Sequence, residues 1–182
     1  MALWIVRHAK PLIEPGICYG ALDLEADASA TLASATALAQ VLPNGLKVDV
    51  SPLRRCQQLQ VALQSLRTDL VFTLEPRLVE MHFGVWEGIA WDAIDHQALS
   101  AWTDDFGNHR FGGVESTNSV LHRVAQVWDQ ALRNSAQDQV WITHAGVARA
   151  ADLISKGIRE VSDASQWPKH APAYGEWVTL DL

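Results

Sequence analysis

Short apolar runs alternate along this chain with longer segments of helical spacing. The first run, Leu3–Arg7, is apolar up to its last residue, which is typical of a strand buried on both faces of a sheet. Similar runs predict strands at Lys47–Ser51, Leu70–Leu74 and Gln139–Thr143, and a looser alternation predicts a last strand at Trp177–Leu182. We therefore expect a sheet of short strands.

Between these strands, apolar residues recur at intervals of three and four, the period of a helix that packs on one face. The predicted helices are Ala28–Leu42, Ser51–Leu66, Trp91–Asp105, Ser116–Asn134 and a last one that starts after His144 and ends near Ile154. In the second helix, Ser51 is a suitable N-cap residue and Pro52 suits the first helical position. The alternation predicts an α/β fold, a three-layer αβα sandwich with a mostly parallel sheet.

The 182 residues suffice for one domain, and 48% apolar with 19% charged residues is ordinary for a globular protein. A net charge of −7 argues against non-specific nucleic-acid binding, which needs a basic surface. The two cysteines, Cys18 and Cys56, are expected to be reduced thiols in a cytoplasmic protein. We expect no metal site, because no cluster of ligands has metal spacing, and no membrane segment. The oligomeric state stays open.

Two histidines follow predicted strands. Arg7 and His8 lie at the carboxyl end of the first strand, and His144 follows the strand Gln139–Thr143. Ligands of open α/β sheets bind at this end of the strands, so both histidines are expected at one sheet edge. A guanidinium beside an imidazole suits an anion, most simply a phosphate. The alternative is that each histidine is merely packed in the core.

Arg54 and Arg55 fall in the first turn of the predicted helix Ser51–Leu66. Positive charge is disfavoured at a helix N-terminus, which itself attracts anions. The pair is either a solvated surface feature or part of a phosphate site.

Four ordered segments carry a family resemblance: Val6–Ala9 (VRHA), Ser51–Cys56 (SPLRRC), Glu80–Gly88 (EMHFGVWEG) and Thr143–Gly146 (THAG). Together they resemble the signature blocks of the histidine phosphatase, or phosphoglycerate mutase-like, superfamily. With Gly16–Asp23 (GICYGALD) and Gly113–Ser116 (GVES), the third block resembles the bacterial α-ribazole phosphatase branch, which dephosphorylates α-ribazole 5′-phosphate in cobalamin synthesis.

The resemblance implies a role for each matching residue. His8 would be the nucleophile that becomes phosphohistidine, Glu80 would protonate the leaving oxygen, and Arg7, Arg55 and His144 would bind the phosphate. It also implies a small-molecule phosphomonoester as substrate and no cofactor or metal. The residue types suit this chemistry, because a neutral imidazole is a usable nucleophile and nearby cations oppose its protonation.

Some positions depart from the family pattern. Ala9 replaces the usual glycine, Lys10 and Pro11 replace an acid or amide followed by a hydroxyl residue, and Glu14 lies where an asparagine is common. A positive φ at Ala9 would be costly. Whether the loop Lys10–Asp27 completes the phosphate pocket therefore stays open.

Other residues have two interpretations. Glu87 and Glu115 are alternatives for the acid, and His82 either lines the pocket or packs beside Glu80. Tyr19 and Trp102 either contact the organic part of a substrate or pack in the core.

Residues 87–113 are expected to form a small cap-like insertion over the sheet end. Mutases of the family tend to carry a longer, more basic insertion to hold a second acidic group, so a phosphatase is favoured over a phosphoglycerate mutase. A non-catalytic binder of phosphorylated ligands is a third hypothesis, although such members usually lose the nucleophile that this chain retains as His8.

Overall fold

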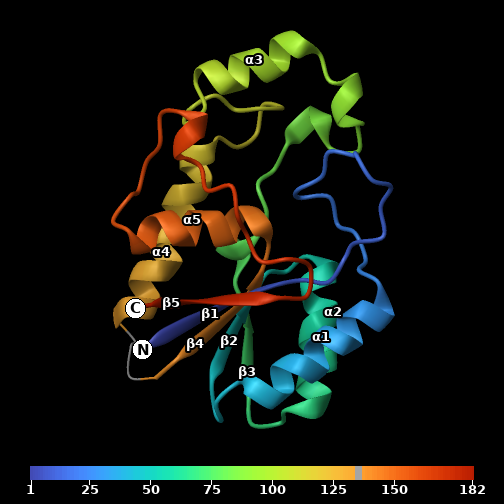
Figure 1. Ribbon diagram of the computed structural model, residues 1–182, viewed down its shortest axis with the longest axis vertical. Coiled ribbons are helices and arrows are strands. Elements are labelled where there is room, and N and C mark those ends of the chain that lie inside the picture. Colours follow the sequence, from blue (N-terminus) through green and yellow to red (C-terminus); the bar gives the residue numbers. More distant parts are fainter. Residues whose placement is uncertain (134–136) are drawn as a thin grey trace.

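The computed structural model describes residues 1–133 and 137–182 and has a five-stranded sheet at its centre (Figure 1). The strands are β1 (Ala2–Arg7), β2 (Lys47–Val50), β3 (Val71–Leu74), β4 (Gln139–Thr143) and β5 (Trp177–Asp181). Their order is β3-β2-β4-β1-β5, and only β5 runs antiparallel to its neighbour. The predicted strands and the mostly parallel sheet are confirmed.

Helices cover both faces of the sheet. Helices α1 (Ala28–Val41) and α2 (Arg54–Leu66) pack on one face, and α4 (Thr117–Arg133) and α5 (Ala145–Ser155) pack on the other. Side chains of a strand point alternately to the two faces. Accordingly, Ile5 contributes to the core beneath α4 and α5, whereas Val6 contributes to the core beneath α1 and α2. This is the predicted three-layer arrangement (Figure 1).

The connections leave β1 and β4 toward opposite faces of the sheet. β1 leads into α1 on one face, whereas its neighbour β4 leads into α5 on the other. Two adjacent strands with this property form a crevice at their carboxyl ends, which is the usual ligand site of an open α/β sheet. The fold therefore places the residues after β1 and β4 at the mouth of that crevice.

Two predicted helices differ in the structure. The second begins at Arg54 rather than Ser51, its N-cap Leu53 makes no side-chain cap bond, and the carboxylate of Asp23 accepts from Arg54 N at 2.7 Å. The expected Ser51 cap is therefore wrong. Asn134, the expected end of the fourth helix, lies outside the described residues.

The predicted helix Trp91–Asp105 is two pieces, the short 3₁₀ helix η3 (Trp91–Ala93) and α3 (His96–Asp104). The break has a local cause, because the Asp95 side chain accepts from Gln97 N and so caps a new helix.

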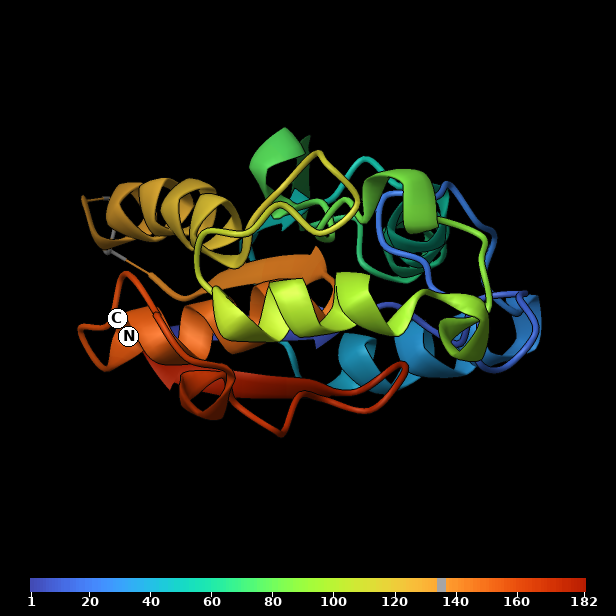
Figure 2. The same cartoon turned by 90° about the horizontal axis from the view of Figure 1, so that it is seen from above.

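The segment that contains α3 extends away from the sheet at the end where the crevice opens (Figure 1). Figure 2, which looks at the molecule from above, shows α3 crossing over the sheet. Its aromatic rings pack on one another, with centroids of Trp102 and Phe111 4.5 Å apart and nearly parallel. The described ranges also contain three further 3₁₀ helices: η1 (Pro76–Leu78), η2 (Gly84–Trp86) and η4 (Ala164–Gln166). No helix of the described ranges combines the length and the hydrophobicity needed to cross a membrane.

Glu87 fastens the loop after β1 to the segment after β3. Its carboxylate accepts from the backbone N–H groups of Gly20, Ala21, Leu22 and Phe83 at 2.9–3.0 Å. An ionised carboxylate that accepts several amide bonds is a strong local anchor. Glu87 therefore holds together two loops that both reach the crevice.

Candidate active site

The two histidines that follow β1 and β4 lie side by side. Parallel pairing sets Arg7 opposite Thr143, so His8 and His144 come next on neighbouring strands. Their ring centroids are 5.0 Å apart, and both side chains are buried. The expectation that the strand ends bring the two histidines to one edge of the sheet is confirmed.

The bonds of His8 define its tautomer. Its Nδ1 lies 2.7 Å from the carbonyl oxygen of Ala9 and must donate, because a carbonyl oxygen only accepts. Arg55 Nε–H donates to His8 Nε2 at 3.2 Å, so Nε2 carries a lone pair. The imidazole is therefore neutral, with Nε2 as the nitrogen able to attack an electrophile.

The surroundings of His8 keep it neutral. Burial disfavours the charged imidazolium, and the guanidinium groups of Arg55 and Arg7 oppose it further, so the pKa of His8 falls to about 3. His144 is fully buried, and burial together with Arg55 also holds its pKa well below the usual value.

His144 is oriented by Ser51. Arg55 Nε–H also donates to His144 Nδ1 at 3.3 Å, which leaves His144 Nε2 to donate to Ser51 Oγ at 2.8 Å. The serine expected to cap α2 therefore fixes the ring of the second histidine instead.

Arg55 is the centre of the cluster. Its side chain is fully buried, and besides both histidines it donates to the carbonyl oxygens of Leu22 at 2.8 Å and Gly20 at 2.6 Å. Arg54 points the other way: it pairs with Glu25 at the surface and is 55% exposed. Of the two arginines expected together, only Arg55 contributes to the site.

Arg7 reaches the same cavity from the end of β1. One of its terminal nitrogens donates to Pro172 O at 3.1 Å, and its guanidinium carbon lies 3.8 Å from the ring centroid of Tyr174. The Tyr174 hydroxyl shares a 2.7 Å hydrogen bond with Tyr19. Arg7 is thus held by an aromatic face and a carbonyl, with donors left for an anion.

Glu80 enters the cavity from the segment after η1. Its two carboxylate oxygens accept from Met81 N at 3.1 Å and Gly146 N at 3.0 Å. Gly146 leaves the space that the carboxylate fills, since a Cβ there would lie 2.2 Å from Glu80 Oε1. Helix α5, which begins next to His144, therefore positions the Glu80 carboxylate.

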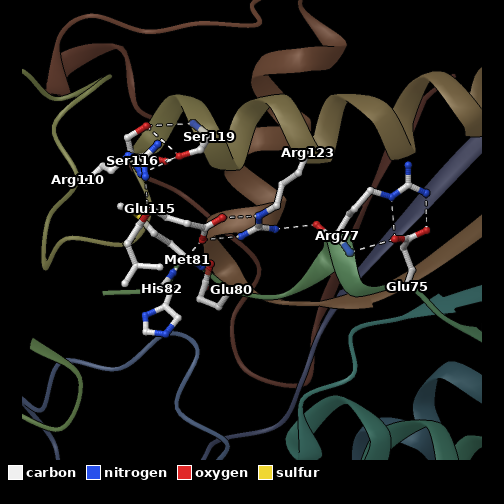
Figure 3. Close-up of polar contacts among 11 residues, drawn as sticks. Glu75, Arg77, Glu80, Met81, His82, Arg110, Glu115, Ser116, Ser119 and Arg123 are labelled. Atoms are coloured by element: carbon white, nitrogen blue, oxygen red, sulfur yellow. Dashed lines mark hydrogen bonds and ion pairs between the residues drawn. The ribbon is translucent and has the colours of Figure 1, made fainter. Parts of the chain in front are cut away.

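Neither Glu115 nor Glu87, the alternatives to Glu80 as the acid, is placed to protonate a leaving oxygen. Glu115 pairs with Arg123 at 2.9 Å and accepts from His82 N at 2.9 Å, which ties α4 to the segment that carries Glu80 (Figure 3). Glu87 is occupied by the amides described above. His82 accepts from Gly84 N at 2.9 Å and does not line the cavity, so its role is local.

The departures from the family pattern have limited effect on the geometry. Within the described residues φ is positive only at glycines, so Ala9 is not strained. Lys10, Pro11 and Glu14 line a separate hollow on the other side of their loop. The same loop does serve the site, since Tyr19 lines the cavity and the carbonyls of Gly20 and Leu22 bind Arg55.

All five predicted site residues come together around one cavity of about 400 Å³. His8, Arg7, Arg55 and Glu80 line it, and His144 lies directly behind Arg55. No group of three or more potential metal ligands occurs within residues 1–133 and 137–182.

Three residues of the site were not predicted from the sequence. Ser51 was assigned to a helix cap, and its place at the carboxyl end of the predicted strand Lys47–Ser51 was the available signal. Arg149 lines the cavity as the sole cation in the apolar first turns of α5. Tyr174 offered no local signal, because only the packing of a distant loop brings it over Arg7.

Comparisons with known proteins found a matching family model and solved structures of similar fold. Residues 3–167 match the family model described as the histidine phosphatase superfamily (branch 1). The native structure of mycobacterial glucosyl-3-phosphoglycerate phosphatase has 24% identity and a TM-score of 0.80, over 98% of this chain and 88% of that one. The protein TTHB049 from Thermus thermophilus has 28% identity and a TM-score of 0.71, over 100% and 94%. No curated protein matches the sequence.

The family model spans most of the chain, and the structural neighbours share its fold over nearly their whole length. The chain belongs to the histidine phosphatase superfamily.

We predict that Gly146→Ala reduces turnover without destabilising the protein. The new methyl group displaces the Glu80 carboxylate, whereas alanine favours the helical conformation over glycine. We expect kcat to fall about 100-fold, the scale of a lost general acid, with no decrease in Tm. In a protein that already carries Glu80→Gln, the addition of Gly146→Ala should cause no further loss of kcat. Undiminished turnover of the single variant would contradict this placement of Glu80.

We also predict that burial of His8 makes stability depend on pH. Between about pH 6.5 and pH 3, the unfolded chain binds a proton that the folded His8 does not, so stability falls with acid. From pH 7 to pH 5, His8 should contribute a loss of about 2 kcal/mol. Urea unfolding in phosphate-free buffer should show that His8→Asn loses about 2 kcal/mol less unfolding free energy between pH 7 and pH 5 than the wild type does. Equal losses in the two proteins would refute the buried neutral state of His8.

Proposed function

We propose that this protein is a metal-independent phosphomonoesterase that acts on a small molecule through a phosphohistidine intermediate. The observation that supports it best is the Arg55 Nε–H shared between His8 Nε2 and His144 Nδ1. This bond leaves a neutral nucleophile next to a buried guanidinium, in a cavity that also holds Arg7 and Glu80. The positive charge of the cavity attracts an anionic phosphomonoester, and His8 Nε2 attacks its phosphorus atom.

In the first step, the lone pair of His8 Nε2 forms a bond to phosphorus and the bond from phosphorus to the ester oxygen breaks. The protonated carboxyl of Glu80 gives its proton to the departing oxygen. Arg7 and Arg55 bind the phosphoryl oxygens, and His144, which bonds Arg55 and Ser51 through its two ring nitrogens, holds Arg55 in place. Catalysis is then mostly positioning and charge stabilisation. The Nδ1–H bond to Ala9 O supports the positive charge that develops on the ring.

In the second step, water attacks the phosphohistidine. The Glu80 carboxylate takes a proton from that water, the nitrogen–phosphorus bond breaks, and its electron pair returns to His8 Nε2. Inorganic phosphate leaves, and Glu80 is protonated again for the next cycle. His8 and Glu80 thus both return to their starting states.

For the substrate we propose α-ribazole 5′-phosphate, as the narrower sequence resemblance implies. The aromatic lining contributed by Tyr19, Trp102 and Phe106 is compatible with such a ring-bearing leaving group. Another small phosphorylated metabolite, or a broad set of them, is the alternative.

We propose that the segment 87–113 is a cap over the cavity. The charges of this segment favour a phosphatase over a phosphoglycerate mutase. Arg110 is its only lysine or arginine, and this side chain does not line the cavity. A second acidic phosphate would find no cation there to hold it.

The test is phosphate release from α-ribazole 5′-phosphate, a panel of small phosphomonoesters and 3-phosphoglycerate, all in EDTA. We expect turnover by the wild type and a loss of at least about 1000-fold in His8→Ala. His82→Ala, which changes a histidine outside the cavity, serves as the control and should stay active.

The outcomes separate the claims. Preference for α-ribazole 5′-phosphate supports the substrate, whereas broad weak turnover that His8→Ala abolishes supports the mechanism alone. Activity that survives in His8→Ala would contradict the mechanism, and 3-phosphoglycerate isomerisation would favour the mutase.

A further inference from the structure

The cavity extends well beyond the phosphate-binding groups. Its volume of about 400 Å³ falls in the range of sites that enclose a whole small molecule, and a phosphate alone would leave most of it empty. The part away from His8 is bounded by Phe83, Trp102, Phe106 and Trp167. Aromatic walls of this kind contact the faces of flat or cyclic groups.

Arg149 lines this outer part and has no role in the proposed mechanism. It is half-buried, and its Nε is buried with no hydrogen-bond partner in the described ranges. The ion pairs of those ranges do not include it. Its terminal nitrogens are not buried and have no hydrogen bond within the described ranges, so they can donate to a ligand in the cavity.

Arg149 lies on the leaving-group side of the phosphate. It follows Gly146 by one helical turn, and Gly146 N holds the Glu80 carboxylate that would protonate the leaving oxygen. Burial lowers the pKa of Arg149, while Glu80 opposes this effect and Arg7 adds to it. The cation is thus near Glu80 without an ion pair to it.

The charges of the cavity define the ligand further. Three arginines line it, both histidines are neutral, and Glu80 is protonated at the start of the proposed reaction, so the lining then carries three positive charges. A phosphomonoester near neutral pH is close to a dianion, because its second pKa is about 6. One positive charge therefore remains when the phosphate is bound, which favours an acceptor group on the organic half of the substrate.

We infer that the outer cavity is a subsite for a ring-bearing organic half of the substrate, with Arg149 as the specificity-determining residue that donates to an acceptor atom on it. This inference rests on the proposed phosphatase function and names the substrate class by its chemistry. Arg149 then contributes to selection among phosphomonoesters rather than to the attack on phosphorus.

The test uses three aryl phosphates of similar leaving-group basicity: phenyl phosphate and its derivatives with a hydroxymethyl or a carboxylate group at the meta position. We expect the wild type to favour the hydroxymethyl compound over phenyl phosphate by about fivefold in kcat/KM, the scale of one hydrogen bond. The carboxylate compound also carries an acceptor and should be favoured over phenyl phosphate at least as much.

Arg149→Met, of similar length and without donors, should abolish the fivefold preference, so that its kcat/KM values for the hydroxymethyl compound and for phenyl phosphate become nearly equal. Arg54→Met, which removes a surface arginine outside the cavity, should keep the preference. Equal loss on all three compounds would overturn the inference, because Arg149 would then act on the phosphate or through Glu80.

Two further results are decisive. A wild type that prefers neither substituted compound to phenyl phosphate would overturn the inference. If the wild type hydrolyses none of these compounds nor any of the phosphomonoester panel, the proposed function itself fails and the inference fails with it.

Discussion

The site depends on one buried cation. Arg55 is fully buried, and three of its five N–H groups are bonded within the described residues: two donate to backbone carbonyls, and Nε–H is shared by one lone pair from each histidine. The other two are left for a phosphoryl oxygen. A buried charge is tolerated only when its donors are matched in this way. The arrangement has a chemical consequence, because an imidazole that accepts from a guanidinium is disfavoured as a cation. The contact that satisfies Arg55 therefore also keeps His8 neutral and its Nε2 ready to attack.

The sheet makes this contact possible. Parallel pairing of β1 with β4 places His8 next to His144, and the opposite departures of the following helices open the crevice above them. Loops complete the frame, since Glu87 fixes the loop whose carbonyls bind Arg55, and α5 supplies the amide that holds Glu80. Phosphate binding and leaving-group protonation are thus served by separate elements that converge on one cavity.

The sequence predicted the parts of this structure that local patterns encode. Buried apolar runs located the strands, and the residues just beyond them, Arg7, His8 and His144, met as expected. Errors arose where a side chain had a distant partner. Ser51 matches a helix cap locally, yet its hydroxyl binds His144, and Asp95 starts a new helix inside a periodic segment. Arg149 resembles any helical arginine until the packed cavity leaves it without a partner among the described residues.

The central claim is that His8 Nε2 forms a covalent bond to phosphorus. The direct measurement is rapid acid-free quenching of the enzyme with a fast-reacting aryl phosphate, followed by mass spectrometry of its peptides. The account predicts a transient phosphate on the peptide containing His8, stable in base and lost in acid, that accumulates in Glu80→Gln and is absent from His8→Asn. Phosphate release by an active enzyme with no phosphorylated His8 at any time, or with the phosphate on another residue, would contradict the account.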